Sequence, residues 1–176
     1  MKIVVVGGGV IGVSSGLALL EDFPTAEVTI ISEKWSPQTT GDVSAGLIYL
    51  YAVGAKTEKN ILHQTFRDSV KFYQNLMHTD SESGRTAGIS LLTMYELQKS
   101  KHAQLDEEAL LCLPAHRSFD DKLIKLLYPH LANQYHSGTE SLCYIAEPVY
   151  LLPYLMKKFQ LKVTNLCQTV IFYIFL

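Results

Sequence analysis

Residues 2–12 read KIVVVGGGVIG, so a run of β-branched residues leads directly into a cluster of glycines. The continuously apolar residues 3–6 predict a fully buried parallel strand. From residue 10 to residue 20 the apolar side chains recur at helical spacing, and Pro24 stops that helix. A strand that becomes a helix across glycines requires a tight turn, and few folds begin this way.

The glycines follow the pattern Gly7-x-Gly9-x-x-Gly12, and a second apolar segment, EVTIIS at residues 27–32, predicts a second strand. Gly7 permits the tight turn, Gly9 lets a pyrophosphate approach the backbone, and Gly12 allows close packing of the helix on the strand. The first amides of the helix and its dipole favour the negative charge of phosphate. The fold class predicted is α/β, with a Rossmann-like βαβ domain that binds a nucleotide.

Glu33 follows the second strand, at the position where an acid accepts hydrogen bonds from the adenosine ribose. A carboxylate there disfavours a 2′-phosphate, so NADP is the poorest candidate. NAD and FAD both fit the residues considered so far.

The rest of the chain predicts a mixture of helices and strands. Residues 33–51, rich at first in Ser, Thr, Gly and Pro, predict a long ligand-facing loop. The remaining predicted elements are an amphipathic helix at 58–77, a turn at 81–88, one or two strands at 89–98, a short helix at 120–127 ended by Pro129, a strand at 135–146 and a helix after Pro153.

Composition argues against several other classes of function. The net charge is −2 and the basic residues form no run, so we expect no nucleic-acid partner. Cys112, Cys143 and Cys167 are widely spaced, which favours reduced, buried thiols, and the six histidines lack metal-site spacing. The apolar end of the chain is too short to span a bilayer, so we expect no membrane contact.

The segment EKWSPQTTGDVSAGL, residues 33–47, adds a more specific signal. Together with the glycine turn, it closely resembles the amino-terminal half of the D-amino-acid oxidase and D-aspartate oxidase family. The matching features are the glycine motif, an acid–base pair, a Ser/Thr-Pro-x-Thr-Thr segment and an Asp-Val-x-Ala-Gly-Leu segment. The phrase TIIS before an acid and Lys leans towards the D-aspartate branch, and a weaker resemblance continues to EPVYLLPYL.

The resemblance implies FAD as the cofactor and assigns residues to it. The implied FAD-binding residues are Gly7, Gly8, Gly9, Val10, Ile11 and Gly12 at the pyrophosphate, Glu33 and Lys34 at the adenosine, Thr39 and Thr40 at phosphate or ribityl oxygens, Ala45, Gly46 and Leu47 along the isoalloxazine ring, and Val163 with Lys162 at the adenine, in an expected third strand. No catalytic residue is assigned. Trp35 is interpreted as a packing residue, Arg67, Arg85 and Arg117 as surface charges, and neither Tyr49 nor Tyr51 receives a catalytic role.

The resemblance also implies a domain plan. Residues 1–52 would form the FAD-binding βαβ and flavin loop, 53–146 part of a mixed α+β substrate domain, 147–164 a return to the FAD-binding domain, and 165–176 an atypical apolar tail. In the family the groups that hold the substrate carboxylate lie beyond this segment. We therefore expect a truncated chain without that site.

The implied activity is oxidative deamination of D-aspartate or neutral D-amino acids by dioxygen, giving a 2-oxo acid, ammonia and hydrogen peroxide. The alternatives are a non-catalytic, truncated FAD-binding isoform and a flavoprotein related to glycine or sarcosine oxidase. The full-length family suggests a possible homodimer. It also implies a peroxisomal location, although the ending Ile-Phe-Leu is not a peroxisomal signal and leaves a cytoplasmic location open.

Overall fold

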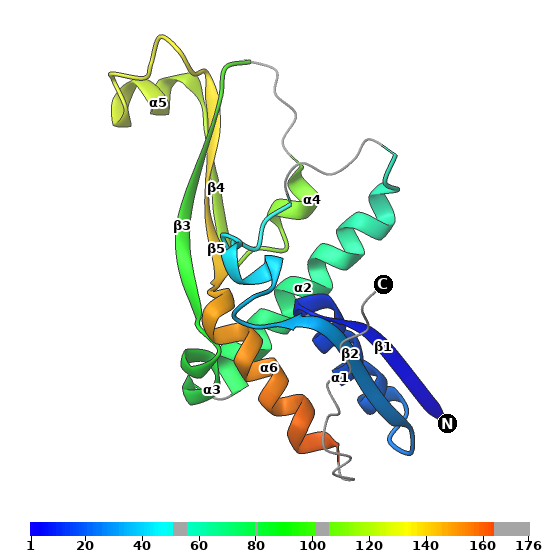
Figure 1. Cartoon of the computed structure of the whole chain (residues 1–176). Coiled ribbons are helices and arrows are strands. Elements are labelled where there is room, and N and C mark those ends of the chain that lie inside the picture. Colours follow the sequence, from blue (N-terminus) through cyan, green and yellow to red (C-terminus); the bar gives the residue numbers. More distant parts are fainter. Residues whose placement is uncertain (51–55, 80, 101–105, 164–176) are drawn as a thin grey trace. The chain divides into compact units, whose positions relative to one another are not determined.

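The computed structural model describes residues 1–50, 56–79, 81–100 and 106–163 (Figure 1). These residues form two compact units. Of the described residues, the first unit takes 1–46, 81–89 and 146–163, and the second takes 47–50, 56–79, 90–100 and 106–145. Tyr51, Cys167 and the apolar segment 165–176 lie outside the described residues.

The first unit is built on the predicted strand–helix–strand element. Strand β1 (Lys2–Gly8) pairs in parallel with β2 (Glu27–Trp35), and α1 (Val10–Asp22) connects them. The register runs regularly to Val6↔Ile31, shifts, and resumes at Gly8↔Trp35. This confirms the α/β prediction. Because β2 continues to Trp35, Glu33 lies inside the strand rather than at its end.

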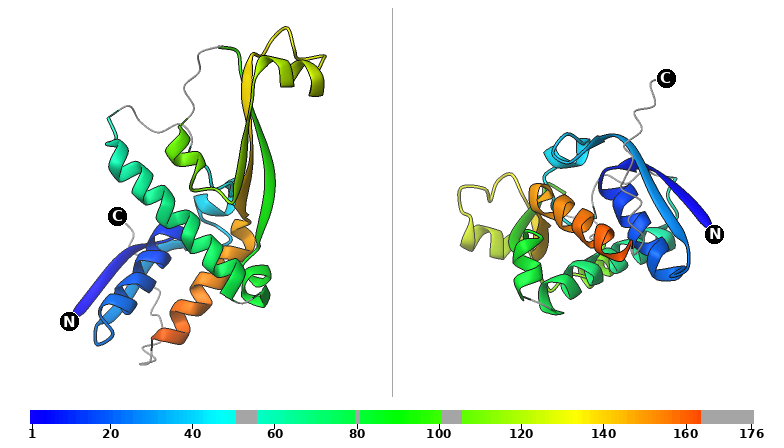
Figure 2. Two further views of the ribbon diagram at one scale, coloured as in Figure 1. Left: turned by 180° about the vertical axis from the view of Figure 1, so that it is seen from behind. Right: turned by 60° about the horizontal axis from the view of Figure 1, so that its bottom comes forward.

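Helix α6 (Pro148–Lys162) packs along α1 (Figure 2). Gly16 of α1 makes the contact close, because a Cβ there would lie 3.0 Å from the ring of Phe159. The prediction that this helix starts after Pro153 was wrong. It starts at Pro148, since proline at the first helical position sacrifices no hydrogen bond.

Two further expectations in this unit were wrong. Residues 81–88 were predicted to be a turn, but Ser81–Thr86 form a short helix, α3, and the chain turns only at Gly88, with φ +68°. Strand β1 was predicted to be fully buried, but Val4 and Val6 are 58% and 83% exposed. The apolar run predicted that both faces of the strand are covered, whereas the described residues cover only one face, and Ile3 and Val5 on that face are only partly buried.

The second unit contains a three-stranded sheet in the order β3-β5-β4 (Figure 1). Its elements are β3 (Ile89–Gln98, of which Ile89 belongs to the first unit), β4 (Ala115–Phe119), β5 (Ser137–Ala146, of which Ala146 belongs to the first unit), α2 (Lys59–Thr79), α4 (Glu107–Leu110) and α5 (Asp121–Leu127). Strands β4 and β5 are antiparallel, from Ala115↔Leu142 to Phe119↔Gly138. The predictions of β3, β5, α2 and α5 were confirmed, whereas β4 and α4 were not anticipated.

The core of this unit contains apolar side chains of α2 and small, partly polar side chains from one face of β5. Phe66 and Val70 are buried, as are Thr139, Ser141 and Cys143 on alternate positions of β5. Cys143 is a free cysteine, and burial raises its pKa to about 11, so its thiol stays protonated and inert at neutral pH. Among the helices of the described residues, none combines the length and apolarity needed to cross a membrane.

Candidate functional site

The glycine turn joins β1 to α1 through an unusually close backbone approach. Gly7 has φ +121°, a conformation that side-chain-bearing residues rarely adopt. A Cβ on Gly12 would lie only 1.8 Å from the carbonyl oxygen of Gly7. Helix α1 can therefore start directly above the end of β1 only because both positions are glycine.

The first turn of α1 is open. Gly9 is its N-cap, no side chain caps the helix, and no acidic residue stands in its first turn. A Cβ on Gly9 would meet only Thr39, at 3.9 Å, and Ile11 is 81% exposed. The unpaired N–H groups at this end, from Val10 onwards, thus face space that a phosphate group can enter.

A loop on the same unit borders this opening. Thr39 precedes a short 3₁₀ helix, η1 (Thr40–Val43), and the carboxylate of Asp42 accepts three hydrogen bonds from Ser36 and Thr39. Desolvation raises the pKa of Asp42, but these hydrogen bonds outweigh it and hold the pKa below its ordinary value. The loop is thus locked by an ionised carboxylate at neutral pH.

The end of β2 is fastened to the glycine turn by side chains that the sequence did not single out. The Gly8 N–H donates to Ser32 Oγ at 2.8 Å, and that hydroxyl donates to the Lys34 carbonyl at 2.6 Å. A Cβ on Gly8 would collide with the Trp35 ring at 2.7 Å. Glu33 and Lys34 are exposed at this end of the strand.

A cleft of about 370 Å³ lies beside this strand end. Its lining residues are Gly8, Trp35, Ser36, Leu152, Pro153, Met156, Lys157 and Gln160. The indole N–H of Trp35 is buried and has no hydrogen-bond partner among the described residues. A buried donor without a partner is energetically costly, so this N–H is an unsatisfied polar group of the first unit.

Ala45 and Gly46 are the last residues of the first segment of the first unit. Gly46 has φ +71°, its carbonyl accepts from the Ala146 N–H at 2.9 Å, and a Cβ on it would lie 2.1 Å from the Ala146 oxygen. Leu47 belongs to the second unit, where it forms a bridge with Ile145. Of the three residues assigned to the isoalloxazine ring, Gly46 and Leu47 are thus held by the end of β5.

Lys162 and Val163 were expected in a third strand, and that expectation was wrong. Lys162 is the last residue of α6 and pairs with Glu21, while the Val163 N–H caps the helix by donating to Phe159 at 3.2 Å. Helix α6 thus extends to Lys162, and Val163 is its C-cap.

The second unit holds a charged cluster that sequence reasoning missed. His63 of α2 is 6% exposed and contacts two carboxylates, Asp106 through Nε2 and Glu108 through Nδ1, each at 2.8 Å. Arg67 joins Glu108 at 3.1 Å, so this arginine is ion-paired and not simply a solvated charge. The hydrogen bond to Asp106 raises the pKa of His63, against desolvation that lowers it.

Glu96 of β3 accepts hydrogen bonds from two polar side chains. Tyr49 donates to Glu96 at 2.7 Å, and Gln98 also donates to that carboxylate. Burial, followed by the hydrogen bond to Glu96, raises the pKa of Tyr49 far above its ordinary value. This tyrosine is therefore a structural hydrogen-bond donor and stays neutral.

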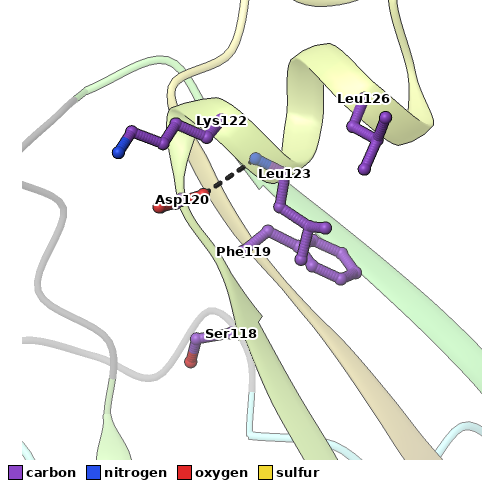
Figure 3. Close-up of a pocket in the computed structure, with 6 residues that line it drawn as sticks. All are labelled: Ser118, Phe119, Asp120, Lys122, Leu123 and Leu126. Atoms are coloured by element: carbon purple, nitrogen blue, oxygen red, sulfur yellow. Dashed lines mark hydrogen bonds between the residues drawn. The ribbon is translucent and has the colours of Figure 1, made fainter.

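A second, wide-open cavity of about 610 Å³ lies between the end of β4 and α5 (Figure 3). It is lined by Ser118, Phe119, Asp120, Lys122, Leu123 and Leu126. The side chain of Asp120 accepts from the Leu123 N–H and so caps α5. None of the residues predicted to bind cofactor lines this cavity.

Comparison with known proteins identifies the class to which this arrangement belongs. Residues 2–171 match the family described as DAO, FAD dependent oxidoreductase. The chain belongs to this family, and FAD is its cofactor. A solved structure, the L-α-glycerophosphate oxidase of Mycoplasma pneumoniae with FAD bound, shares the fold with a TM-score of 0.66 at 15% identity, covering 92% of this chain and 43% of that one.

Two curated proteins are similar in sequence. A D-amino acid oxidase of Dugesia ryukyuensis is 29% identical over 161 residues, which are 92% of this chain and 46% of that protein. A D-aspartate oxidase of Homo sapiens is 32% identical over 99 residues, which are 56% of this chain and 28% of that protein. The chain thus spans less than half the length of these relatives.

Proposed function

We propose that this chain supplies the FAD site of an oxidase that deaminates D-amino acids. The observation that carries the proposal is the open start of α1, where glycines replace every side chain that would obstruct a pyrophosphate. The names of the two curated relatives support D-amino acids, D-aspartate or neutral ones, as the substrate class.

The residues present fit FAD in three respects. The uncapped amides after Gly9 suit the pyrophosphate, and exposed Glu33 on β2 suits the ribose hydroxyls. The cleft beside the end of β2 also carries Lys157 and Gln160, whose side chains can donate hydrogen bonds to a polar, electron-rich group. We assign the remaining contacts to Lys34, Thr40, Ala45, Gly46 and Leu47.

Bound FAD would accept a hydride from the α-carbon of the amino acid and pass the electrons to dioxygen, releasing hydrogen peroxide. The part played by this chain is binding and orientation. The amides of α1 would hold the pyrophosphate, and the backbone of Ala45 and of Gly46, which Ala146 fixes by a hydrogen bond, would contact the ring. We assign no residue of the chain to proton or hydride transfer.

The first experiment is to incubate the purified chain with FAD, desalt it and record its absorption. Retention of one flavin per chain supports the proposal, and a colourless protein contradicts it. Glu33→Gln should weaken FAD binding about tenfold, because it replaces a charged acceptor with two oxygens by a neutral amide with only one acceptor oxygen for the ribose hydroxyls. The matched control is Glu27→Gln on the same strand, whose carboxylate pairs with Lys2 at 3.3 Å and should leave FAD affinity unchanged.

The second experiment measures hydrogen peroxide from the flavin-loaded chain. Release with D-aspartate or D-alanine but not with L-alanine supports D-amino-acid oxidation. Release with glycine or sarcosine instead supports the glycine-oxidase alternative. Flavin retention without peroxide supports the alternative of a non-catalytic FAD-binding chain. A homodimer and a peroxisomal location belong to the proposal for the whole protein.

A further inference from the structure

The carboxylate of Asp42 uses both of its oxygens inside the loop. Oδ1 accepts from Ser36 Oγ at 2.6 Å. Oδ2 accepts from the backbone N–H of Thr39 at 2.8 Å and from Thr39 Oγ1 at 2.6 Å. An ionised carboxylate can only accept, so the hydroxyl proton of Thr39 points to Asp42. That proton therefore does not serve a cofactor oxygen.

Thr40 is the next residue, and its position is different. It is exposed, opens η1, and makes none of the three hydrogen bonds to Asp42. Its hydroxyl makes no hydrogen bond to another described residue, so its proton is available to a ligand. Two adjacent threonines of the same motif thus have different hydrogen-bonding capacity.

The fixed threonine also borders the phosphate entrance. The Cβ and Oγ1 atoms of Thr39 lie 3.9 Å from the place where a Cβ of Gly9 would stand. The same loop also approaches α6, because a Cβ on Gly41 would lie 3.5 Å from Thr39 Oγ1 and 3.7 Å from Leu152. The loop is therefore seated between the glycine turn and α6, and Thr39 forms the wall opposite the start of α1.

We propose that Asp42 is a positioning residue for the cofactor, which fixes Thr39 as a wall of the phosphate entrance and leaves Thr40 as the hydroxyl that donates to the cofactor. The assignment rests on the proposed FAD site. It divides between two threonines a role that the family resemblance gives to both.

The test combines FAD affinity, from quenching of flavin fluorescence, with amide hydrogen exchange of Thr39 in the absence of FAD. Asp42→Asn should weaken FAD binding about tenfold and accelerate exchange of the Thr39 amide. Thr40→Val should weaken FAD binding without changing that exchange. Asp120→Asn, which alters a helix-capping aspartate of the other unit, is the matched control and should change neither quantity.

Thr39→Ser and Thr39→Val keep the experiment decisive if Asp42→Asn does not fold. The serine variant retains the hydroxyl and should bind FAD like the wild type, whereas the valine variant should bind more weakly. FAD affinity of Asp42→Asn within twofold of wild type, or no effect of Thr40→Val, would overturn the proposal. If the wild type binds no FAD, the proposed function fails. Independently of FAD, equal exchange rates of the Thr39 amide in wild type and Asp42→Asn would refute the claim that Asp42 fixes Thr39.

Discussion

Alanine substitutions at Gly9 and Gly12 should have opposite consequences, although the two glycines are only one helical turn apart. At Gly12 the new Cβ would lie 1.8 Å from the Gly7 oxygen, whereas ordinary contact begins at 3.4 Å. The helix and strand would have to separate by about 1.6 Å, backbone against backbone. Overpacking of this kind costs about 3 kcal/mol, the upper end of the usual range.

At Gly9 the backbone is extended, with φ −84° and ψ −172°, which alanine adopts without strain. The new Cβ meets only Thr39, at 3.9 Å, so the protein without FAD loses about 1 kcal/mol or less, through a poorer N-cap. The methyl group would, however, stand where the pyrophosphate approaches. FAD affinity should fall at least about a hundredfold, equivalent to about 2.7 kcal/mol.

Urea unfolding followed by circular dichroism, without FAD, measures the stability of both variants, and titration with FAD measures affinity. The reasoning is refuted if Gly9→Ala is as unstable as Gly12→Ala. It is also refuted if Gly9→Ala retains wild-type affinity for FAD. If Gly12→Ala does not fold at all, its loss of stability is in the expected direction. The FAD affinity of Gly9→Ala can then still be measured.

Two further predictions concern the second unit. Because its hydrogen bond to Asp106 raises the pKa of His63 above 6.5, the stabilisation from this contact is complete below that pH and is lost as the pH rises through the folded pKa. Urea midpoints of the wild type should therefore fall above pH 6.5 more steeply than those of His63→Gln, and parallel profiles would contradict this. Arg117→Ala breaks an exposed ion pair with Glu140 and should cost below about 1 kcal/mol in the same assay; a larger loss would mean that the pair is more than a surface contact.

Local features of the site could be predicted from the sequence, since they depend on residues close together in the chain. The turn at Gly7 and the approach at Gly12 follow from the glycine spacing alone. The role of Asp42 could also have been found, because a threonine followed three residues later by an acid, as in Thr39-x-x-Asp42, is a helix-start signal. In this sequence the signal lies inside the family motif, where the resemblance gives Asp42 no role of its own.

Features that depend on distant segments could not be predicted in this way. Strand β4 has the sequence AHRSF, with only Phe119 buried, so it carries no apolar alternation, and it is a strand because β5 pairs with it. The exposure of one face of β1 also depends on distant segments, since it reflects which of them cover the strand. An apolar run indicates what a strand can bury, and the neighbouring segments decide how much of it is covered.

The same distinction separates two kinds of site residue. Gly7, Gly9 and Gly12 act through the absence of a side chain, so their role is visible in any sequence that places them between a strand and a helix. Thr39 and Thr40 have the same side chain, and only the position of Asp42 gives Thr39 a structural hydrogen bond that Thr40 does not make with it. Residue type therefore identifies the glycines of a cofactor site, whereas the assignment of its hydroxyl groups requires the hydrogen-bond network around them.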